Sequence, residues 1–302
     1  MMTAAALVIR STLPARRVLF NVPCDNERFL SKAVGMPVDC LTLDLEDGVG
    51  EEKKEVARDR LRAMLMETAP LARFPHSREV LVRINGADSP HFDADLACLA
   101  SIPAERRPHG ILLPKTESAA HLKRLNQWVD AHYGSHQPQP SLLLAIETAR
   151  GIVDLKDTLS GGDIRRAQAL IFASEDYCAD LGLSRSPEAS EMLWARSQLV
   201  AHARAFRLQA IDMVCIDYQN KEQLVRECQD GVRMGFDGKQ AIHPSQIDVI
   251  LDHFRPSKTT LQFARDILAA VELHGGKPFV LQGIVVDTPV VKWAQLINSS
   301  RE

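Results

Sequence analysis

Two short apolar runs in the sequence end abruptly in acidic residues. Residues 142–146 are followed by Glu147, and residues 169–173 are followed one position later by Glu175 and Asp176. Such runs are typical of strands buried on both faces, and an acid that ends one must lie at the rim of the sheet, because an unpaired buried charge is unfavourable. Acids from two strand ends can hold one hard cation. We therefore predict a Mg²⁺ site with Glu147 and Asp176 as ligands, and Glu175 as the alternative to Asp176.

Basic side chains follow other apolar runs. Arg83 carries a planar guanidinium that suits a substrate carboxylate or a developing oxyanion, and a structural ion pair with a nearby acid is the alternative. Lys115 follows Pro114 and can meet a phosphate or carboxylate, or be a plain surface charge. Lys54 and Arg58 lie one helical turn apart, a spacing that usually marks solvated charges. Lys54 is nevertheless predicted, with Arg83 and Lys115, to contact the substrate.

The remaining candidates have several interpretations. Asp44 and Glu46 are close enough in sequence to hold metal-bound water or to organise the site. His243 can act as an acid or base, but a hydrogen-bonding role behind the metal ligands is preferred. Asp287 stands alone near the C-terminus before Thr288 and a proline, where spacing alone predicts a helix N-cap.

Strand and helix signals alternate along most of the chain. This pattern predicts repeated βα units, and residues 16–255 supply the roughly 250 residues of a closed TIM (β/α)8 barrel. An open doubly wound sheet is disfavoured because no Gly-x-Gly-x-x-Gly follows the first strand. In a barrel, all the candidate residues that follow strands converge on one mouth. The expected strands cover residues 18–22, 40–45, 80–84, 110–113, 142–146, 169–173, 210–216 and 239–242.

The two ends of the chain fall outside this barrel. Residues 1–15 are expected to form an N-terminal extension. The first 24 residues contain no acid but carry Arg10, Arg16 and Arg17, a composition that fits either a short mitochondrial targeting segment or a frayed end. Residues 256–302 contain a helix, an extended stretch and a final helix. This tail is short and apolar, so we expect it to pack on the barrel or on a neighbouring subunit.

The overall composition excludes several classes of partner. The 302 residues have a net charge of −3, which gives no electrostatic case for nucleic acid or a membrane surface. Charged residues make up 25% of the chain, and no apolar stretch reaches the roughly 18 residues of a spanning helix. The six cysteines include no CxxC pair, which favours reduced thiols in a reducing compartment, the cytoplasm or the mitochondrial matrix.

Eight segments of the sequence, taken in order, match the motifs of a known family. The segments are Asp44-Leu-Glu-Asp-Gly48, Lys54 to Arg58, Val82-Arg-Ile-Asn85, Leu113-Pro-Lys115, Ile146-Glu-Thr148, Phe172 to Asp176, Gly235-Phe-Asp-Gly-Lys239 and Ile242-His-Pro244. They resemble the citrate lyase beta-subunit-like family, which belongs with the malyl-CoA lyases and the HpcH/HpaI aldolases. The match covers nearly the whole chain from Arg16 to its end, and the C-terminal tail is most similar to the mitochondrial-type citramalyl-CoA lyase branch.

The resemblance implies a fold, an activity and residue roles. It implies a TIM barrel, usually trimeric, that cleaves a β-hydroxyacyl-CoA such as citramalyl-CoA or malyl-CoA into acetyl-CoA and a 2-keto acid. Glu147 and Asp176 match the Mg²⁺ ligands and Arg83 matches the residue that grips the substrate. Asp287 matches a catalytic acid/base delivered by the tail of a neighbouring subunit. The alternatives are an aldolase of free hydroxy-keto acids and a citrate lyase beta-type subunit.

Overall fold

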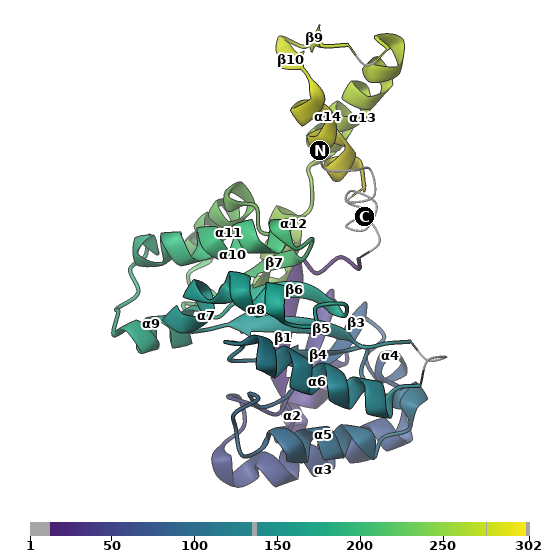
Figure 1. Cartoon of the computed structure of the whole chain (residues 1–302), viewed down its shortest axis with the longest axis vertical. Coiled ribbons are helices and arrows are strands. Elements are labelled where there is room, and N and C mark those ends of the chain that lie inside the picture. The colour runs from purple at the N-terminus through teal and green to yellow at the C-terminus, as the bar shows by residue number, and fades with distance from the viewer. Residues whose placement is uncertain (1–12, 135–137, 276, 300–302) are drawn as a thin grey trace.

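The computed structural model of the chain describes residues 13–134, 138–275 and 277–299. Eight parallel strands close into a barrel in which each strand pairs with its neighbours in sequence and β8 returns to β1. Helices surround this barrel, so the predicted TIM barrel is confirmed (Figure 1). The strands are β1 (Val18–Pro23), β2 (Cys40–Asp44), β3 (Glu79–Arg83), β4 (Gly110–Leu113), β5 (Ser141–Ile146), β6 (Ala167–Phe172), β7 (Gln209–Asp212) and β8 (Gly238–Ala241).

The helices lie between consecutive strands on the outside of the barrel. Short 3₁₀ turns (Glu51–Lys53, Ala104–Arg106, Ser190–Met192 and Pro244–Gln246, the last called η4) precede or separate several of them. The α-helices of the barrel are α2 (Glu27–Ala33), α3 (Lys54–Glu67), α4 (Pro70–Arg73), α5 (Phe92–Ala100), α6 (Ala119–His132), α7 (Ala149–Val153), α8 (Leu155–Gly161), α9 (Ser174–Leu181), α10 (Leu193–Ala205), α11 (Lys221–Met234) and α12 (Ile247–Phe254).

Alternation along the strands divides the core into two parts. Outward residues such as Phe20 and Val82 pack against the helices, and inward residues such as Leu19, Leu81 and Ile171 fill the barrel interior. Both sets are buried, which explains why the strands appear in the sequence as continuous apolar runs. Above this inner layer, at the carboxyl ends of the strands, the inward positions become polar.

The amino end of the barrel is closed by a buried ion pair. Arg16 Nε and Nη2 donate to the two carboxylate oxygens of Glu79 at 2.7 and 2.9 Å, and Ser141 Oγ also donates to Glu79. Arg17 makes a second buried pair with Asp39. Two of the basic residues that suggested a targeting segment therefore belong to the folded barrel, and residues 1–12 lie outside the described part of the chain.

The seventh strand is shorter than predicted. It ends at Asp212, whose carboxylate accepts hydrogen bonds from Arg196 Nε at 3.0 Å and Nη2 at 2.8 Å. Residues 213–216 leave the ladder although Met213 and Cys215 stay buried. Asp217, which directly follows the predicted strand, therefore does not lie at the end of β7, because β7 ends five residues before it.

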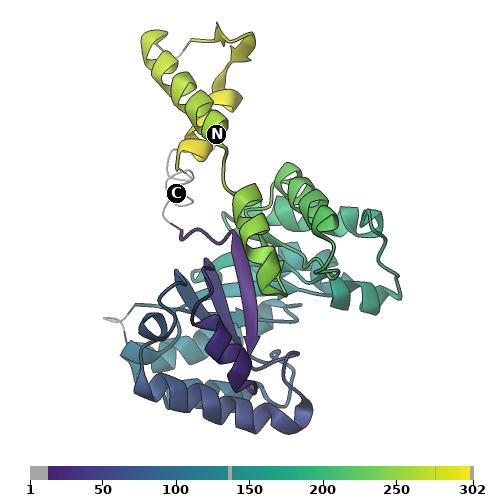
Figure 2. The same ribbon diagram turned by 180° about the vertical axis from the view of Figure 1, so that it is seen from behind.

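The C-terminal tail stands apart from the barrel. It consists of α13 (Lys258–Leu273), the hairpin β9 (Phe279–Leu281) and β10 (Ile284–Val286), and α14 (Thr288–Ser299). These elements pack on one another around Ala264, Ile267, Val286 and Ala294. Figures 1 and 2 show them projecting beyond the end of the barrel from which α12 leaves. Of the two predicted arrangements, packing on the chain's own barrel is therefore not observed.

Two further observations concern the environment of the protein. All six cysteines are buried and free. In the part of the chain that the structure describes, no helix is both long and apolar enough to cross a membrane.

Candidate active site

Three acids converge at the barrel mouth. Glu46 and Asp47 follow β2, Glu147 follows β5, and one carboxylate oxygen from each lies within 4.8 Å of the others. Glu147 is 3% exposed and its Oε2 has no hydrogen-bond partner among the described residues. Burial, together with repulsion from Glu46 and Asp176, raises the pKa of Glu147 to about 8. Such a cluster of carboxylate oxygens, in which Glu46 and Glu147 are buried and Asp47 is exposed, is a suitable environment for a hard divalent cation.

Glu175 and Asp176 both lie in the first turn of α9, but their side chains have different surroundings. Glu175 accepts a hydrogen bond from Arg185 Nη1 at 2.7 Å and another from Ser174 Oγ at 3.0 Å. Asp176 faces the acid cluster, and its pKa is raised by partial burial and then by the charge of Asp47. Asp176 lies outside the group of three converging acids, but it lines the same cavity as all of them. Asp47, which the sequence did not single out as a ligand, lies inside that group.

Arg83 is held by Asp44 in a two-point ion pair. Its Nε and Nη2 donate to the Asp44 carboxylate at 2.7 and 2.6 Å, and its Nη1 lies 3.0 Å from Glu46 Oε2. Asp44 also accepts hydrogen bonds from the backbone N–H groups of Glu46 and Gly48. A Cβ on Gly48 would overlap the Asp44 carboxylate, so this turn requires glycine. The structure thus shows the ion pair that was the alternative prediction for Arg83. Arg83 also lines a cavity, and its contact with a substrate stays a prediction.

Lys54 has a positioning role in place of the predicted substrate contact. It is buried, and its ammonium donates to the carbonyls of Leu45 and Glu46 and to Asn85 Oδ1 at 2.9–3.0 Å. These three bonds use all three of its donors. They fix the turn that carries Glu46 and Asp47 against the end of β3.

Lys115 reaches across to the acids from the end of β4. Its Nζ lies 2.8 Å from Glu46 Oε1 and 3.2 Å from Asp47 Oδ1. Its backbone is in the left-handed region, with φ of 49°, an unfavourable conformation for a lysine that is tolerated mainly at functional sites. The two acids raise the pKa of Lys115 even though burial opposes this, so the side chain stays charged beside the cluster.

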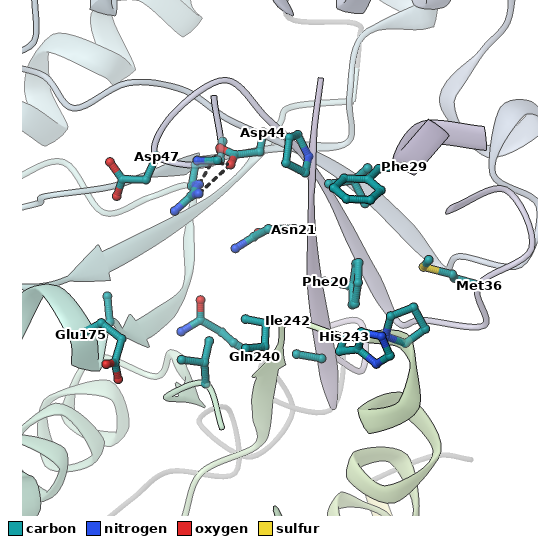
Figure 3. A pocket seen from close by; sticks show the side chains of 18 of the residues that line it. Phe20, Asn21, Phe29, Met36, Asp44, Asp47, Glu175, Gln240, Ile242 and His243 are labelled. Carbon is teal, nitrogen blue, oxygen red and sulfur yellow. Dashed lines mark hydrogen bonds and ion pairs between the residues drawn. The ribbon is translucent and has the colours of Figure 1, made fainter. Parts of the chain in front are cut away.

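Two cavities flank the acid cluster. One, of about 620 Å³, lies between the acids and the loop after β3. The other, of about 490 Å³, runs from Arg83 and Asp47 across the end of β1. Figure 3 shows that this second cavity is polar on the inner side of β1 and apolar on its outer side, where Phe20, Phe29 and Met36 lie. We call the outer part the β1 groove.

His243 lies in the β1 groove and not behind the metal ligands. Its ring stacks on Tyr218 with centroids 4.5 Å apart, and its Nδ1 is 2.8 Å from Ser245 Oγ at the start of η4. These contacts cap η4 and shape the groove. The structure therefore does not support its predicted role as a hydrogen-bonding partner of the acids.

Asp287 is distant from the mouth of its own barrel. It is exposed and precedes α14, where its Oδ1 accepts a hydrogen bond from Val290 N at 3.4 Å. This contact is the helix cap that spacing predicted. Because the tail leaves from the amino end of the barrel, this aspartate cannot reach the acids of the same chain.

Several residues of the site were not predicted as functional. Asn85 lies two residues after the end of β3, and its Nδ2 donates to the carbonyl of Leu45 and to Asp95. Asn21 and Gln240 line the cavity from β1 and β8. Inward polar residues on otherwise apolar strands are the signal that would have identified these last two.

A closed (β/α)8 barrel with acids and cations gathered at the carboxyl ends of its strands defines a TIM-barrel enzyme. The chain belongs to the HpcH/HpaI aldolase/citrate lyase family, whose profile matches residues 16–244. The family predicted from the sequence is thus confirmed.

Individual relatives cover almost the whole chain. The mitochondrial citramalyl-CoA lyase of Rattus norvegicus is 36% identical over 94% of this chain and 85% of its own length. The citrate lyase subunit beta of Escherichia coli strain K12 is 32% identical over 100% of this chain and 98% of its own. The crystal structure of Mycobacterium tuberculosis CitE in complex with magnesium, acetoacetate and coenzyme A is 31% identical, with a TM-score of 0.74 over 94% of this chain and 97% of that one.

Proposed function

We propose that this protein is a Mg²⁺-dependent carbon–carbon lyase that cleaves, or in reverse forms, a β-hydroxyacyl-CoA. Citramalyl-CoA would yield acetyl-CoA and pyruvate, and malyl-CoA would yield acetyl-CoA and glyoxylate. The observation that carries this proposal is a cluster of converging acids beside Arg83, of which Asp47 also lines the cavity that continues into the apolar β1 groove. The similarity to citramalyl-CoA lyase supports the reaction class.

The chemistry of the acids fits Mg²⁺. We propose Glu147 and Asp176 as its ligands, with Glu46 and Asp47 placed to accept hydrogen bonds from metal-bound water. The unpartnered Oε2 of Glu147 and the engagement of Glu175 by Arg185 support this choice. When bound, Mg²⁺ lowers the pKa of the substrate hydroxyl and stabilises the keto acid as it forms.

The side chains of the barrel orient the substrate. Asp44 fixes the plane of Arg83, so the guanidinium can grip a substrate carboxylate without reorganising. Lys115 adds a second positive charge at the same rim. The apolar β1 groove suits the pantetheine arm of the CoA thioester, which would place the reacting carbon between this groove and the acids.

The proton for the product carbon comes, in this proposal, from Asp287 of a neighbouring copy in a homotrimer. The tail exposes apolar side chains that an intersubunit contact would cover, with Val280 67% and Val285 62% exposed. A tail docked over the mouth of an adjacent barrel would carry Asp287 to that site. Asp287 would then serve as acid in cleavage and as base in condensation.

Turnover assays test the proposal directly. Citramalyl-, malyl- and citryl-CoA should each be incubated with the full chain, with and without Mg²⁺. We expect Mg²⁺-dependent release of acetyl-CoA and a keto acid from citramalyl- or malyl-CoA. Because a hydrophobic pocket discriminates one methyl by only about 1–3 kcal/mol, both can react. Exclusive cleavage of citryl-CoA would favour the citrate lyase beta-type alternative.

The aldolase alternative has its own test. An enzyme for free hydroxy-keto acids needs the same metal and arginine but no CoA site. We expect the protein to be retained on immobilised CoA and eluted by free CoA. Failure to bind, together with cleavage of free hydroxy-keto acids, would replace the lyase proposal.

We also propose a reducing compartment, either the cytoplasm or the mitochondrial matrix. Six free and buried cysteines support it. The mammalian relative carries the word mitochondrial in its name, which agrees with the second choice.

A further inference from the structure

The active-site cavity contains an amide that neither the acid cluster nor Arg83 uses. Asn21 lies on β1 two residues after Leu19, which belongs to the barrel interior, so strand alternation directs Asn21 inward. Its Oδ1 is buried without a partner, and no hydrogen bond joins its side chain to another described residue. An unpaired buried amide lowers stability. Packing and hydrogen bonding within the fold therefore give no reason for asparagine here.

Asn21 lies at the junction between the two parts of the cavity. Figure 3 shows it on the inner side of β1, with Asp44 and Asp47 beyond it on one side and Phe20 and Phe29 across the strand on the other. A ligand that occupies both parts must pass over this side chain.

The side-chain amide of Gln240, which lines the same cavity, presents a hydrogen-bond acceptor and not a donor. Gln240 Nε2 donates to the carbonyl of Phe172 at 3.0 Å, so Gln240 offers its oxygen, an acceptor, to the cavity. Arg83 has two of its nitrogens committed to Asp44 and the third facing Glu46. The Nδ2 group of Asn21 is thus a neutral donor at this junction that has no hydrogen-bond partner among the described residues.

We propose that Asn21 Nδ2 donates a hydrogen bond to the thioester oxygen of the bound acyl-CoA and stabilises the enolate that forms during the reaction. The inference rests on the proposed lyase function. If the CoA arm lies in the β1 groove and the keto acid lies at the acids, the thioester carbonyl falls between them, where Asn21 lies. Asn21 is then a catalytic residue in addition to those that hold the metal and the proton.

The electron flow explains why a donor is useful there. In cleavage, the substrate hydroxyl gives its proton to water and becomes the carbonyl of the keto acid as the carbon–carbon bond breaks. The electron pair of that bond moves onto the thioester, whose oxygen gains negative charge as the enolate, and the methylene carbon then takes a proton from Asp287 of the neighbouring copy. In condensation, removal of a methyl proton creates the same charge. A preorganised donor aimed at such an oxygen contributes about 100-fold to 1,000-fold in kcat.

Two variants of Asn21 test the assignment. Asn21→Leu keeps the branching and the number of heavy atoms of the side chain and removes the donor, and Asn21→Asp keeps the shape and places a negative charge opposite the enolate. The matched control is Thr42→Val, because Thr42 pairs with Asn21 in the β1–β2 register and is fully buried but does not line the cavity. Thermal unfolding of each variant shows whether it is folded. If one of the two Asn21 variants is unstable, the other still tests the proposal, because the two substitutions change the side chain in different ways.

Three measurements distinguish a catalytic role from a structural one. We expect Asn21→Leu to lower kcat for citramalyl- or malyl-CoA by about 100-fold, Asn21→Asp to lower it further, and Thr42→Val to leave it unchanged. By calorimetry, Asn21→Leu should weaken binding of S-carboxymethyl-CoA, whose planar carboxylate resembles the enolate, by about 10-fold. Binding of CoA itself should not change.

The outcomes separate this inference from the function on which it rests. A wild-type protein without activity on any of these thioesters would overturn the proposed function, and the role of Asn21 with it. An active wild type with a folded Asn21→Leu variant of nearly equal kcat and equal affinity for S-carboxymethyl-CoA would overturn the role of Asn21 alone.

Discussion

Replacing Glu147 with glutamine distinguishes two effects of its buried charge. One is the loss of stability that the charge causes in the metal-free protein, and the other is its contribution to Mg²⁺ binding. Burial and repulsion from Glu46 and Asp176 raise the pKa of Glu147 to about 8, and Arg83 and Lys115 offset this only in part. Because the folded-state pKa lies above the unfolded value of about 4.3, the folded metal-free protein binds this proton more tightly. Its free energy of unfolding therefore falls as pH rises from about 4.5 to about 8 and levels off above that range.

The size of the effect follows from the same pKa. The rise from 4.5 to about 8 corresponds to on the order of 5 kcal/mol, at about 1.4 kcal/mol per pH unit. Glutamine cannot ionise, but its unpaired amide costs about 1–3 kcal/mol. Without metal, we expect Glu147→Gln to be about 2 kcal/mol more stable than the wild type at pH 9. This corresponds to a rise of about 4–8 °C in melting temperature, and the advantage should disappear by pH 5.

Mg²⁺ should reverse the order of stability. At about 100 times its Kd it stabilises the wild type by about 2.7 kcal/mol, and because Glu147 must lose its proton to act as a ligand, this gain should grow from pH 6 to pH 9. Glu147→Gln should show little gain and no turnover. Glu175→Gln, at a residue engaged by Arg185, is the control and should keep the Mg²⁺ response.

Thermal unfolding at pH 5, 7 and 9, with and without Mg²⁺, measures both effects. The reasoning is refuted if Mg²⁺ stabilises Glu147→Gln as much as the wild type. It is also refuted if the two metal-free proteins show the same dependence on pH.

Three further substitutions test the other parts of the site. Arg83→Lys removes the two-point contact with Asp44, and we expect kcat/KM to fall at least about 100-fold in steady-state assays, whereas a decrease of less than threefold would return Arg83 to a structural ion pair. Lys54→Met leaves two carbonyls and Asn85 Oδ1 without a donor, which should cost about 2 kcal/mol in urea unfolding; an unchanged midpoint would contradict the positioning role. Asp287→Asn should bind CoA thioesters but not turn them over, and mixed oligomers with Glu147→Gln should recover part of the activity. No recovery would argue against a site shared between subunits.

The fold was predictable because local and global signals agree along the barrel. Parallel strands covered on both faces must be apolar throughout, so β5 and β6 are visible as short runs between helical patterns. The end of β7 was not predictable for the same reason. Met213 and Cys215 are as buried as residues of a strand, although they lie outside the hydrogen-bonded ladder of β7. The apolar character of a segment indicates that it is buried but does not indicate whether its backbone pairs with a neighbouring strand.

The location of the candidate site could be predicted from the sequence, but the roles of its individual side chains could be predicted only in part. The rule that residues after barrel strands share one mouth places Glu147, Arg83 and Lys115 together. It cannot say that the ammonium of Lys54 is used by Asn85 and two carbonyls, because those partners come from other strands. The choice between Glu175 and Asp176 as metal ligand also could not be made from the sequence. Arg185, the partner of Glu175, lies beyond the end of α9, and nothing in the local sequence indicates that contact.

The position of the tail depends on topology and not on composition. Each barrel helix runs antiparallel to the preceding strand, so α12 returns the chain to the amino end of the barrel, opposite the mouth. Whatever follows α12 begins on the wrong side for its own site, and α13, at 16 residues, extends about 24 Å further in the observed direction. In the proposed homotrimer, the tail would therefore reach the mouth of another copy of the chain, and the mixed-oligomer experiment tests this arrangement before any single-chain mechanism for Asp287 is considered.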